Sequence, residues 1–585
     1  MIRFASTCLL GLFALPAIAE PPAPVGARVA EFARTDVLTG KPWALAEQTR
    51  EAKVTVIAFT STGCPASLAY APRLVDMQKR YAKQGVQFVA INSHLDEDAA
   101  SVAKQATALG LNFPVLKDDG TTLADKLSID RVPCVLLLDA TKTVRYKGRI
   151  DDQFAPGVHR SKATTRELGN ALDALLEGRE IAAPFVAAAG CKLTRTKVAV
   201  ANENITYHKQ VSRIFQAKCQ ECHREGEAGP FALTSYKTAA NWSDMIREVV
   251  ADDIMPPWHA DAPRGHFKND RRLSDDEKKT LLAWVDAGCP EGDAKDAPPP
   301  IKTVQGWRLS RKPDIVLTME KPVQVPAASL LGMGVPYQYI WAGEAFKEDT
   351  WVTGIEVRAD YRAVVHHIIA FVIPPGAEVY DIAGPEFGRH MLGAYVPGDQ
   401  PIELPEGYAR KLEKGSRIIF ELHYTPNGKP GNDASMIGLV TTKTPPKVEV
   451  GNVSIANYKF QLPANSTQEV KSKQMFPKAT TLVSLTPHMH YRGKAFKYEL
   501  VEFGKDGKEN RSLLLNVPKY DFNWQVSYDF AKPPTVPAGA WIECTATFDN
   551  TTANPFNPDP AKRVRWGNQT WEEMMIGFAM YHTAK

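Results

Sequence analysis

The stretch LTPHMHYRGK, residues 485–494, places two histidines one residue apart in a run with the pattern of a β-strand. Side chains alternate between the two faces of a strand, so His488 and His490 point the same way, with Cα atoms about 6.5–7 Å apart. Two imidazoles in this arrangement can bind one metal at bond lengths of roughly 2 Å. The stretch therefore predicts a β-rich C-terminal region that holds a metal, whose other ligands lie elsewhere in the chain.

The length and composition are those of a globular protein with several domains. A chain of 585 residues is too long for one hydrophobic core, which predicts about three to five domains. Its formal charge of +4 is small for this length, so we expect no nucleic-acid partner and no polybasic membrane surface. Beyond the N-terminus, we find no apolar run of the ~18 residues that a membrane-spanning helix needs.

Residues 1–19 have the pattern of a secretory signal peptide. Arg3 precedes an apolar run, residues 8–18, and Ala17 and Ala19 complete an A-x-A cleavage site. We therefore expect a soluble mature protein that is periplasmic or secreted, where cysteine pairs can oxidise. Seven cysteines remain after cleavage, an odd number that leaves at least one outside any intrachain disulfide. They are Cys64, Cys134, Cys191, Cys219, Cys222, Cys289 and Cys544.

Hydrophobic patterning divides the mature chain into four domains and a linker. Residues 20–190 alternate strand-like and helix-like runs, which predicts an α/β sheet domain. Residues 191–292 contain short helical runs and predict a small, mostly α-helical domain. Residues 293–312, rich in proline and charge, are expected to form a linker. Residues 313–445 and 446–585 contain short alternating strands between turns, which predicts two antiparallel, jelly-roll-like β-sandwiches.

The stretch KCQECHREGEAGPF carries the C-x-x-C-H spacing of covalent c-type haem attachment. Cys219 and Cys222 would form the two thioether bonds, and His223 would be the proximal ligand of the iron. Export favours haem over a redox disulfide or half of a zinc site, because c-type attachment takes place outside the cytoplasm. The segment resembles a class I cytochrome c, in which a proline such as Pro230 lies behind the proximal histidine.

The distal haem ligand is expected in the stretch DIMPPWHAD or shortly after it. Met255 precedes a proline, as the axial methionine of that family usually does, and a thioether ligand raises the haem potential. His259 and His266 remain the alternatives.

Three further stretches add candidate metal ligands. His366 and His367 are adjacent in the apolar stretch YRAVVHHIIAFV, and His423 lies in RIIFELHYTPNG. An imidazole buried there without a partner would be costly. Met574 precedes the final hydrophobic strand. Imidazole together with a thioether suits copper that cycles through Cu(I), rather than zinc or iron.

In their order along the chain, these motifs resemble the copper type II, ascorbate-dependent monooxygenases, the family of peptidylglycine α-hydroxylating and dopamine β-monooxygenases. The resemblance covers about the last 270 residues and rests on H-H, L-H-Y, H-M-H-Y-R-G-K and G-x-x-T-x-x-E-M. It implies two copper sites, each in its own sandwich, with the substrate in the cleft between them. The implied ligands of the electron-transferring copper are His366, His367 and His423. Those of the copper that reacts with oxygen are His488, His490 and Met574.

Two features of this sequence bear on that resemblance. Neighbouring strand residues face opposite sides, so His366 and His367 can share one metal only at a bulge or a strand end. Cys544 occupies the position of a family disulfide partner, but the residue after Met574 is Met575. That family disulfide is therefore expected to be missing.

The first domain resembles a thioredoxin-fold redoxin through TSTGCPASL, at the start of a helix, and RVPCV, before a late strand. A cysteine at a helix N-terminus, such as Cys64, has a lowered pKa. By resemblance, Pro133 is the cis-proline beside it. Ser67 replaces the second thioredoxin cysteine, which leaves Cys134 as the candidate partner.

Three interpretations of this domain stay open. Cys64 and Cys134 form a redox pair, or Cys64 acts alone as a peroxidase-like thiol, or the fold serves docking and its cysteine is inert. Cys191 and Cys289 flank the haem motif and are candidates for a second pair.

Together these features predict an exported copper and haem monooxygenase that uses O2 to hydroxylate a C–H bond of a small or peptide-like substrate. Ascorbate or a periplasmic electron-donor protein would supply electrons, in the latter case through the haem. Two alternatives remain: a copper and haem protein of electron transfer or copper handling, and a thiol-redox protein whose C-terminal domains recognise a partner.

Overall fold

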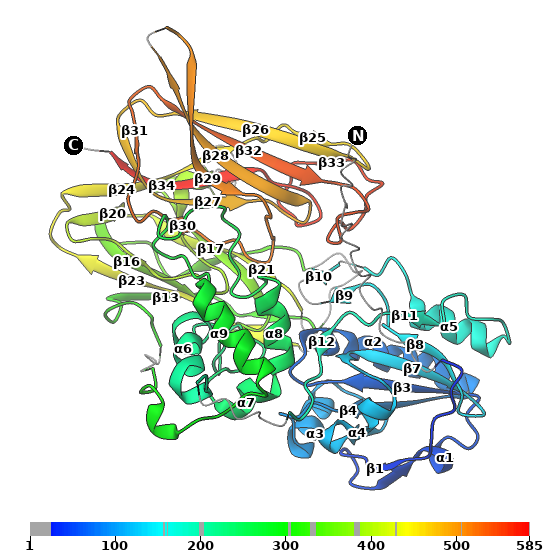
Figure 1. Ribbon diagram of the computed structural model, residues 1–585. Coiled ribbons are helices and arrows are strands. Elements are labelled where there is room, and N and C mark those ends of the chain that lie inside the picture. The colour runs from blue at the N-terminus through cyan, green and yellow to red at the C-terminus, as the bar shows by residue number, and fades with distance from the viewer. Residues whose placement is uncertain are drawn as a thin grey trace, which may run out of the picture.

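The computed structural model describes nine stretches of the chain, and the predicted signal peptide lies outside them. These are residues 25–155, 158–160, 162–197, 204–301, 306–327, 335–378, 387–426, 430–504 and 506–583. Figure 1 shows an N-terminal α/β domain, a neighbouring group of short helices and a large C-terminal body of β-strands. None of the helices in the described stretches is long and apolar enough to cross a membrane.

The N-terminal domain is built on a six-stranded sheet in the order β11-β8-β7-β3-β4-β5. Strands β3, β4 and β5 are parallel, whereas β7 is antiparallel to β3 and β8. This confirms the predicted α/β, thioredoxin-like fold. The elements are β1 (Ala33–Thr35), β2 (Pro42–Ala44), α1 (Leu45–Gln48), β3 (Val54–Thr60), α2 (Pro65–Tyr81), η1 (Ala82–Gln84), β4 (Val86–Asn92), α3 (Ala99–Ala108), β5 (Val115–Lys117), η2 (Asp119–Thr121), α4 (Thr122–Lys126), β6 (Arg131–Val132), β7 (Cys134–Asp139), β8 (Val144–Gly148), β9 (Phe154–Ala155), β10 (Val158–His159), α5 (Glu167–Leu176) and β11 (Phe185–Val186).

Local sequence explains where the first long helix begins. Strand β3 is buried on both faces, as its apolar run requires, and the chain then turns into α2 at Cys64. Pro65 occupies the first helical turn, where its missing N–H costs no hydrogen bond. Cys64 is thereby held at the N-terminus of α2, as predicted from the sequence.

The second domain consists of short helices that share a hydrophobic core with the first. Its α9 begins with a capping box formed by Ser274 and Glu277. Trp242 and Trp284 lie in one buried cluster with Cys64 and Leu136 of the α/β domain. The two domains therefore form a continuous apolar contact. The elements are β12 (Cys191–Lys192), η3 (Tyr207–Val211), α6 (Ser212–Lys218), α7 (Tyr236–Asn241), α8 (Ser243–Ala251), α9 (Asp275–Asp286) and η4 (Ala294–Asp296).

The C-terminal region is mostly β-sheet, as predicted, but one sheet runs through both of the expected sandwiches. The first unit contains β13 (Ile315–Thr318), β14 (Val323–Val325), β15 (Gln338–Ala342), β16 (Thr350–Arg358), β17 (Val365–Ile373), α10 (Phe387–His390), β18 (Met391–Tyr395), β19 (Ile402–Glu403), β20 (Tyr408–Leu412), β21 (Arg417–Tyr424), β22 (Gly431–Asp433) and β23 (Met436–Thr442). The second contains β24 (Val448–Ala456), β25 (Gln461–Leu462), β26 (Thr467–Met475), β27 (Thr480–His488), β28 (Gly493–Phe503), β29 (Glu509–Val517), β30 (Tyr528–Asp529), β31 (Thr535–Val536), β32 (Trp541–Asp549), β33 (Val564–Arg565) and β34 (Ile576–Thr583).

The shared sheet has ten strands, with β13-β23-β16-β20-β24-β34-β27-β30 as its main path. The units join where β20 and β24 pair in parallel, with Tyr408 opposite Val448. A four-stranded sheet, β15-β21-β17-β18, completes the first unit, and β26-β32-β28-β29 completes the second. An apolar cluster that includes Ile369 and Met574 packs the first unit against the second.

The helical domain also packs against the C-terminal sheets. Ala260 and Phe267 are buried in the core of the second unit, and Phe267 forms an isolated bridge with Phe530. The start of the predicted linker packs on α6, because Arg213 donates to the carbonyl of Asp296 at 2.9 Å. The linker is thus partly ordered against its neighbour rather than extended between domains.

The structure corrects the predicted partner of Cys64. Cys64 forms a disulfide with Cys191, with their Cα atoms 5.9 Å apart. The short strand β12 pairs with β6 and places Cys191 opposite Val132, next to the cis peptide bond at Pro133. Cys134 points elsewhere in the core, and burial raises the pKa of its thiol to about 12. Of the three interpretations left open for this domain, the one in which Cys64 and Cys134 form a redox pair is therefore wrong.

The other candidate pairings are also settled by this disulfide. Cys191 is unavailable to Cys289, so the suggested Cys191–Cys289 pair does not form; Cys289 is a buried free thiol. Cys544 is likewise a buried free thiol, in agreement with the expectation that the family disulfide is missing. The backbone of Gly577 packs closely against this thiol, because a Cβ added to Gly577 would lie 2.5 Å from the Cys544 sulfur.

We predict that mass mapping of the oxidised native protein recovers a linked Cys64–Cys191 peptide. Cys134 should resist alkylation until the protein is denatured, because a pKa of about 12 leaves about one thiol in ten thousand ionised at pH 8. The variant Cys191→Ser should leave Cys64 unpaired while Cys134 stays unreactive. Recovery of a Cys64–Cys134 peptide would contradict this account.

Candidate functional site

The C-x-x-C-H motif lies in the turns that follow α6, with its three side chains half-buried. Cys219 and Cys222 are not joined to each other or to another described cysteine. The Nδ1 of His223 donates to the carbonyl oxygen of Phe231 at 3.1 Å, which leaves Nε2 for another partner. This arrangement orients the imidazole as a ligand.

The segment after the motif fits closely around it. A Cβ added to Gly229 would lie 2.7 Å from the Cys222 carbonyl oxygen and 2.8 Å from the His223 Nδ1. Only glycine therefore lets the chain pass the histidine at this distance. Two thiols that have not formed a disulfide, beside an imidazole with one nitrogen engaged, match the donor set of a c-type haem.

The three candidates for the distal ligand have different surroundings. His266 packs its ring against Phe267 and Phe530, on the second β-unit. His259 also lies near that unit, where burial lowers its pKa and Asp521 opposes the effect. Met255 follows α8, and its backbone N–H donates to the carbonyl of Val249. Of the three candidates, Met255 is thus the one that contacts a helix of the helical domain, to which all three belong in sequence.

The first group of candidate copper ligands is brought together by strands β17 and β21. The register shifts between Val365 and His367, which is the irregularity that adjacent histidines need to share a metal. His367 lies opposite His423 on the neighbouring strand. One ring nitrogen from each of His366, His367 and His423 lies within 4.8 Å of the other two.

The geometry of this first group fits a metal. The Nδ1 atoms of His366 and His367 lie 3.0 Å apart, the separation expected of two nitrogen ligands about 2 Å from one metal. The Nε2 of His367 is buried, with no hydrogen-bond partner among the described residues. Burial and neighbouring histidines hold the pKa of His367 well below its usual value, so the ring is neutral.

The second group lies where β27 ends. His488 is its last residue, and His490 follows in the next turn, with ring centroids 5.3 Å apart. The His488 Nδ1 donates to Oε1 of Gln525 at 2.5 Å, and the Gln525 amide is oriented by donating to the Phe522 carbonyl. Burial lowers the pKa of His488 to about 4. The neutral ring therefore offers Nε2 to a ligand site.

A buried carboxylate holds the backbone around His490. One Glu573 oxygen accepts from the His490 N–H at 2.9 Å, and the other accepts from the Arg492 N–H at 2.6 Å. Burial raises the pKa of Glu573 to about 7, and the Arg492 guanidinium opposes the effect. The His490 Nδ1 faces the Glu572 carbonyl at 3.4 Å. The His490 Nε2 is left without a hydrogen-bond partner in the described part of the chain.

Met574 follows Glu573 directly and is 3% exposed. It lies in the apolar cluster between the units, together with Phe578. The Phe578 ring lies 6.3 Å from the His488 ring. Met574 thus shares an apolar cluster with Phe578, whose ring lies near His488, and directly follows the carboxylate that binds the His490 backbone.

The two histidine groups face each other across the contact between the units. The ring centroids of His367 and His488 are 6.4 Å apart, and Phe522 stacks on His366 at 4.7 Å. Tyr337 lies 4.8 Å from His423 and 6.3 Å from His490. Each group sits in its own unit, as expected, but here aromatic side chains pack between the groups.

The haem motif is docked on the first β-unit through charged contacts. Glu221, between the two motif cysteines, contacts Arg308 at 3.2 Å and accepts from Gln400. Arg362 forms an ion pair with Glu227, four residues after His223. Arg362 lies four residues before His366, so this ion pair connects the haem loop to the segment that carries the first histidine group.

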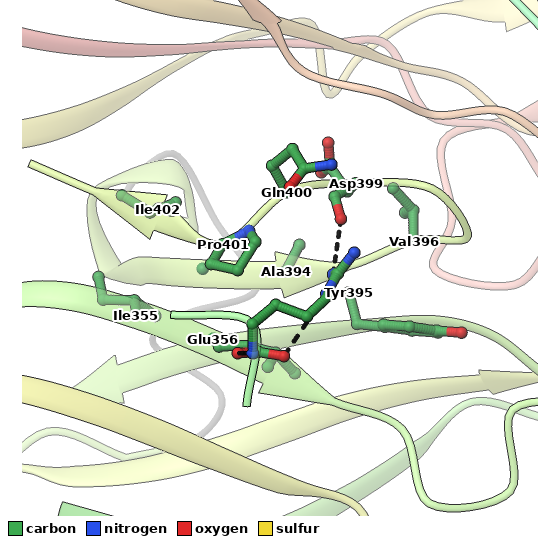
Figure 2. A pocket seen from close by; sticks show the side chains of 12 residues that line it. Ile355, Glu356, Ala394, Tyr395, Val396, Asp399, Gln400, Pro401 and Ile402 are labelled. Carbon is green, nitrogen blue, oxygen red and sulfur yellow. Dashed lines mark hydrogen bonds and ion pairs between the residues drawn. The ribbon is translucent and has the colours of Figure 1, made fainter. Parts of the chain in front are cut away.

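Arg308 links these contacts to a pocket of the first unit. Its guanidinium lies 3.6 Å from Glu356 and donates to the Asp399 carbonyl at 2.7 Å. In Figure 2, dashed lines mark the two contacts of the Arg308 guanidinium, one with the Glu356 carboxylate and one with the Asp399 carbonyl oxygen. A cavity of about 800 Å³ opens beside it, lined by the helical domain, by β18 and by strands β27 and β34. Thr486 and Phe578, both close to His488, contribute to its wall.

Sequence reasoning singled out Cys191 but gave it the wrong partner. It missed several other residues that the structure brings to these sites: Arg308, Phe522, Gln525 and Glu573. Glu573 had a signal, because it immediately precedes Met574 in the motif. Gln525 and Phe522 lie in a stretch without regular pattern before β30, and only the fold brings them to the histidines.

Comparisons with known proteins identify the first two domains. Residues 25–147 match the AhpC/TSA family, and residues 208–285 match the family described as cytochrome C oxidase, cbb3-type, subunit III. The chain therefore carries an N-terminal thioredoxin-like redoxin domain and a cbb3-type cytochrome c domain. Both indicate redox chemistry and are typical of extracytoplasmic proteins, and the cytochrome domain supports covalent haem.

Individual relatives cover parts of the chain. The chain is 28% identical over 89 residues to the thiol-disulfide oxidoreductase ResA of Halalkalibacterium halodurans, which is 15% of this chain and 49% of ResA. It thus spans about half the length of this curated relative.

Two solved structures have low TM-scores to the whole chain. A hypothetical protein of Sinorhizobium meliloti 1021 is 31% identical, with 29% of this chain and 92% of that chain covered and a TM-score of 0.27. A secreted disulfide oxidoreductase of Mycobacterium tuberculosis is 23% identical, with 19% and 79% covered and a TM-score of 0.17.

We predict that Gln525→Leu weakens copper binding at the second histidine group by about 10–100-fold, because the His488 ring loses the acceptor that orients it. Competition with a Cu(I) chelator measures this affinity site by site. Gln474→Leu, on β26 of the opposite sheet, is the matched control and should bind copper normally. Unchanged copper affinity in Gln525→Leu would contradict the role of the Gln525 hydrogen bond in orienting His488 as a ligand.

Proposed function

We propose that the protein is an exported copper- and haem-dependent monooxygenase that hydroxylates a C–H bond of a small or peptide-like substrate with O2. The observation that carries the proposal is the pair of buried imidazole groups that face each other, with His367 and His488 rings 6.4 Å apart. Such a donor set, with a thioether nearby, suits copper better than zinc or iron.

His366, His367 and His423 would hold one copper, and His488, His490 and Met574 would hold the other. When bound, the coppers would supply oxygen activation and one-electron transfer. The protein supplies the geometry: Gln525 fixes the His488 ring, and Glu573 fixes the backbone at His490. Burial keeps the rings of His367 and His488 neutral.

The cytochrome domain would serve as the entry point for electrons from a periplasmic donor protein, whereas ascorbate could reach copper directly. Two charged contacts support this arrangement. Glu221 of the haem motif meets Arg308, and Glu227 meets Arg362 at the start of the segment that leads to His366. Since Arg362 and His366 are four residues apart, their Cα atoms are separated by at most about 14 Å.

A second candidate function is copper and haem electron transfer, or copper handling, without oxygenation. It is favoured by the burial of the histidines, since His367 is 2% exposed and His490 is fully buried. Oxygen uptake separates the two functions. The copper-loaded, haem-containing protein should consume O2 in proportion to hydroxylated product in a substrate screen. Electron transfer to an acceptor without substrate-dependent O2 uptake would favour the second candidate.

Met574→Leu should abolish substrate oxidation while the protein keeps roughly half of its copper. Leucine has a similar volume but no sulfur, so packing is preserved and the soft ligand is lost. Metal analysis and product formation are measured together. Met575→Leu, in the adjacent buried position, is the control and should keep both coppers and full turnover. A fully active Met574→Leu would assign Met574 to the apolar core alone.

The double variant Cys219→Ala/Cys222→Ala should lose turnover driven by a reduced periplasmic cytochrome but keep turnover with ascorbate. The physical reason is that its copper ligands lie in other domains, whereas covalent haem needs both cysteines. Glu221→Gln keeps both cysteines and serves as a control that retains haem. Equal activity of the wild type and the double variant with both donors would rule out electron entry through the haem.

A further inference from the structure

The Cys64–Cys191 disulfide lies at the contact between the redoxin and cytochrome domains. Cys64 is fully buried and Cys191 is 6% exposed. Both belong to the apolar core that the two domains share, which also contains Trp242 of the cytochrome domain. The backbone N–H of Lys192, next to Cys191, donates to the sulfur of Met245 on α8. The disulfide is therefore packed directly against the haem-carrying domain.

Trp242 is held against the loop that carries Cys64. A Cβ added to Gly63 would lie 2.8 Å from Cζ2 of Trp242, so the indole touches the residue before Cys64. The ring also packs on His94 of the redoxin domain, with centroids 4.1 Å apart. The neighbouring Asn241 donates to Asp96 at 3.2 Å, which fastens the same segment.

From Trp242, aromatic contacts continue to the haem motif. Trp242 and Phe231 are stacked, with ring centroids 4.0 Å apart and planes 7° apart. Phe231 lies 5.0 Å from the ring of His223, and its carbonyl accepts the His223 Nδ1 proton. A continuous line of ring contacts thus connects the Cys64 loop with the proximal haem ligand.

We propose that Trp242 and Phe231 carry electrons from the reduced Cys64/Cys191 dithiol to the haem bound at Cys219, Cys222 and His223. The redoxin domain would then act as an internal electron source for the cytochrome domain. This activity depends on the haem site and not on copper. Under the proposed monooxygenase function, one dithiol holds the two electrons and two protons that hydroxylation with one O2 requires.

Oxidation of the dithiol breaks two S–H bonds, forms one S–S bond and releases two protons to solvent. The two electrons leave the dithiol one at a time, and each reduces the ferric haem once. Because the protein has a single haem, a one-electron acceptor reoxidises the haem before the second electron arrives. A small thiol or phosphine reopens the disulfide by attack at one of its sulfurs, and Cys191 is the more exposed of the two residues. The phosphine becomes its oxide.

The direction of electron transfer follows from the reduction potentials of the dithiol and the haem. The dithiol of thioredoxin itself is strongly reducing, and a haem with a thioether ligand has a raised potential. With Met255 as distal ligand, electrons therefore pass from the dithiol to the haem. Trp242 and Phe231 act through their positions and do not themselves bind substrate or iron.

The test uses full-length, haem-loaded protein, freed of copper by a chelator and reduced with tris(2-carboxyethyl)phosphine, which is then removed by desalting. Ferricyanide is added stepwise without oxygen, while haem absorption and the alkylation of Cys64 and Cys191 are followed. In the wild type, the haem should stay ferrous through the first two equivalents as the disulfide re-forms, and oxidise with the third. In Trp242→Leu, the haem should oxidise with the first equivalent, and the disulfide should re-form at least tenfold more slowly.

Controls separate this path from direct oxidation. Trp242→Phe keeps an aromatic ring and should restore most of the wild-type order, and Cys191→Ser should oxidise its haem with the first equivalent. Phe231→Leu provides a second break in the path if Trp242→Leu fails to incorporate haem. Wild-type behaviour in a folded, haem-loaded Trp242→Leu or Phe231→Leu would overturn the proposal, as would disulfide formation at the same rate in Cys219→Ala/Cys222→Ala. Because copper is absent, either result leaves the proposed monooxygenase function untouched.

Discussion

The shift in register between Val365 and His367 is the constraint on which the arrangement of the candidate metal ligands depends. Adjacent residues of a regular strand point to opposite faces, so without the shift only one of the two histidines could face His423. Strand β21 must also pair with β17 in the observed register, because His367 and His423 lie opposite each other. The second unit then closes over this group with Phe522, His488 and the segment before β34.

The same packing sets the order of the redox groups through the molecule. The disulfide lies in the core shared by the redoxin and cytochrome domains, and the haem motif lies between that core and the first β-unit. Arg362 and Glu227 join the haem loop to the histidine strand, while Phe267 anchors the cytochrome domain in the second unit. These contacts give the helical domain a fixed place between the thiol centre and the copper candidates.

Much of this could be predicted from local sequence. The α/β domain follows from buried strand runs around an amphipathic helix, and the cytochrome domain follows from the C-x-x-C-H spacing. The structure confirms the α/β domain, and the family matches support both domains. The histidine pairs could be singled out because burying an imidazole in an apolar strand is costly unless its nitrogens have a partner. The need for a bulge at His367 could also be foreseen from strand geometry.

What could not be predicted depends on distant contacts. Cys191 meets Cys64 through a two-residue strand 127 positions away in the sequence, a signal too short for any periodicity. Cys134, near in sequence to the cis-proline, was the more obvious and wrong partner. The parallel pairing of β20 with β24 joins the two expected sandwiches through one continuous sheet. Gln525, which hydrogen-bonds His488, lies in a stretch without regular secondary structure.

Anomalous diffraction from crystals of the full-length, copper-loaded protein tests the central claim most directly. Data collected at the copper edge should show two peaks, one among His366, His367 and His423 and the other beside His488, His490 and Met574. Data at the iron edge should show one peak next to His223. A single copper peak, or copper bound away from these histidines, would contradict the two-site account.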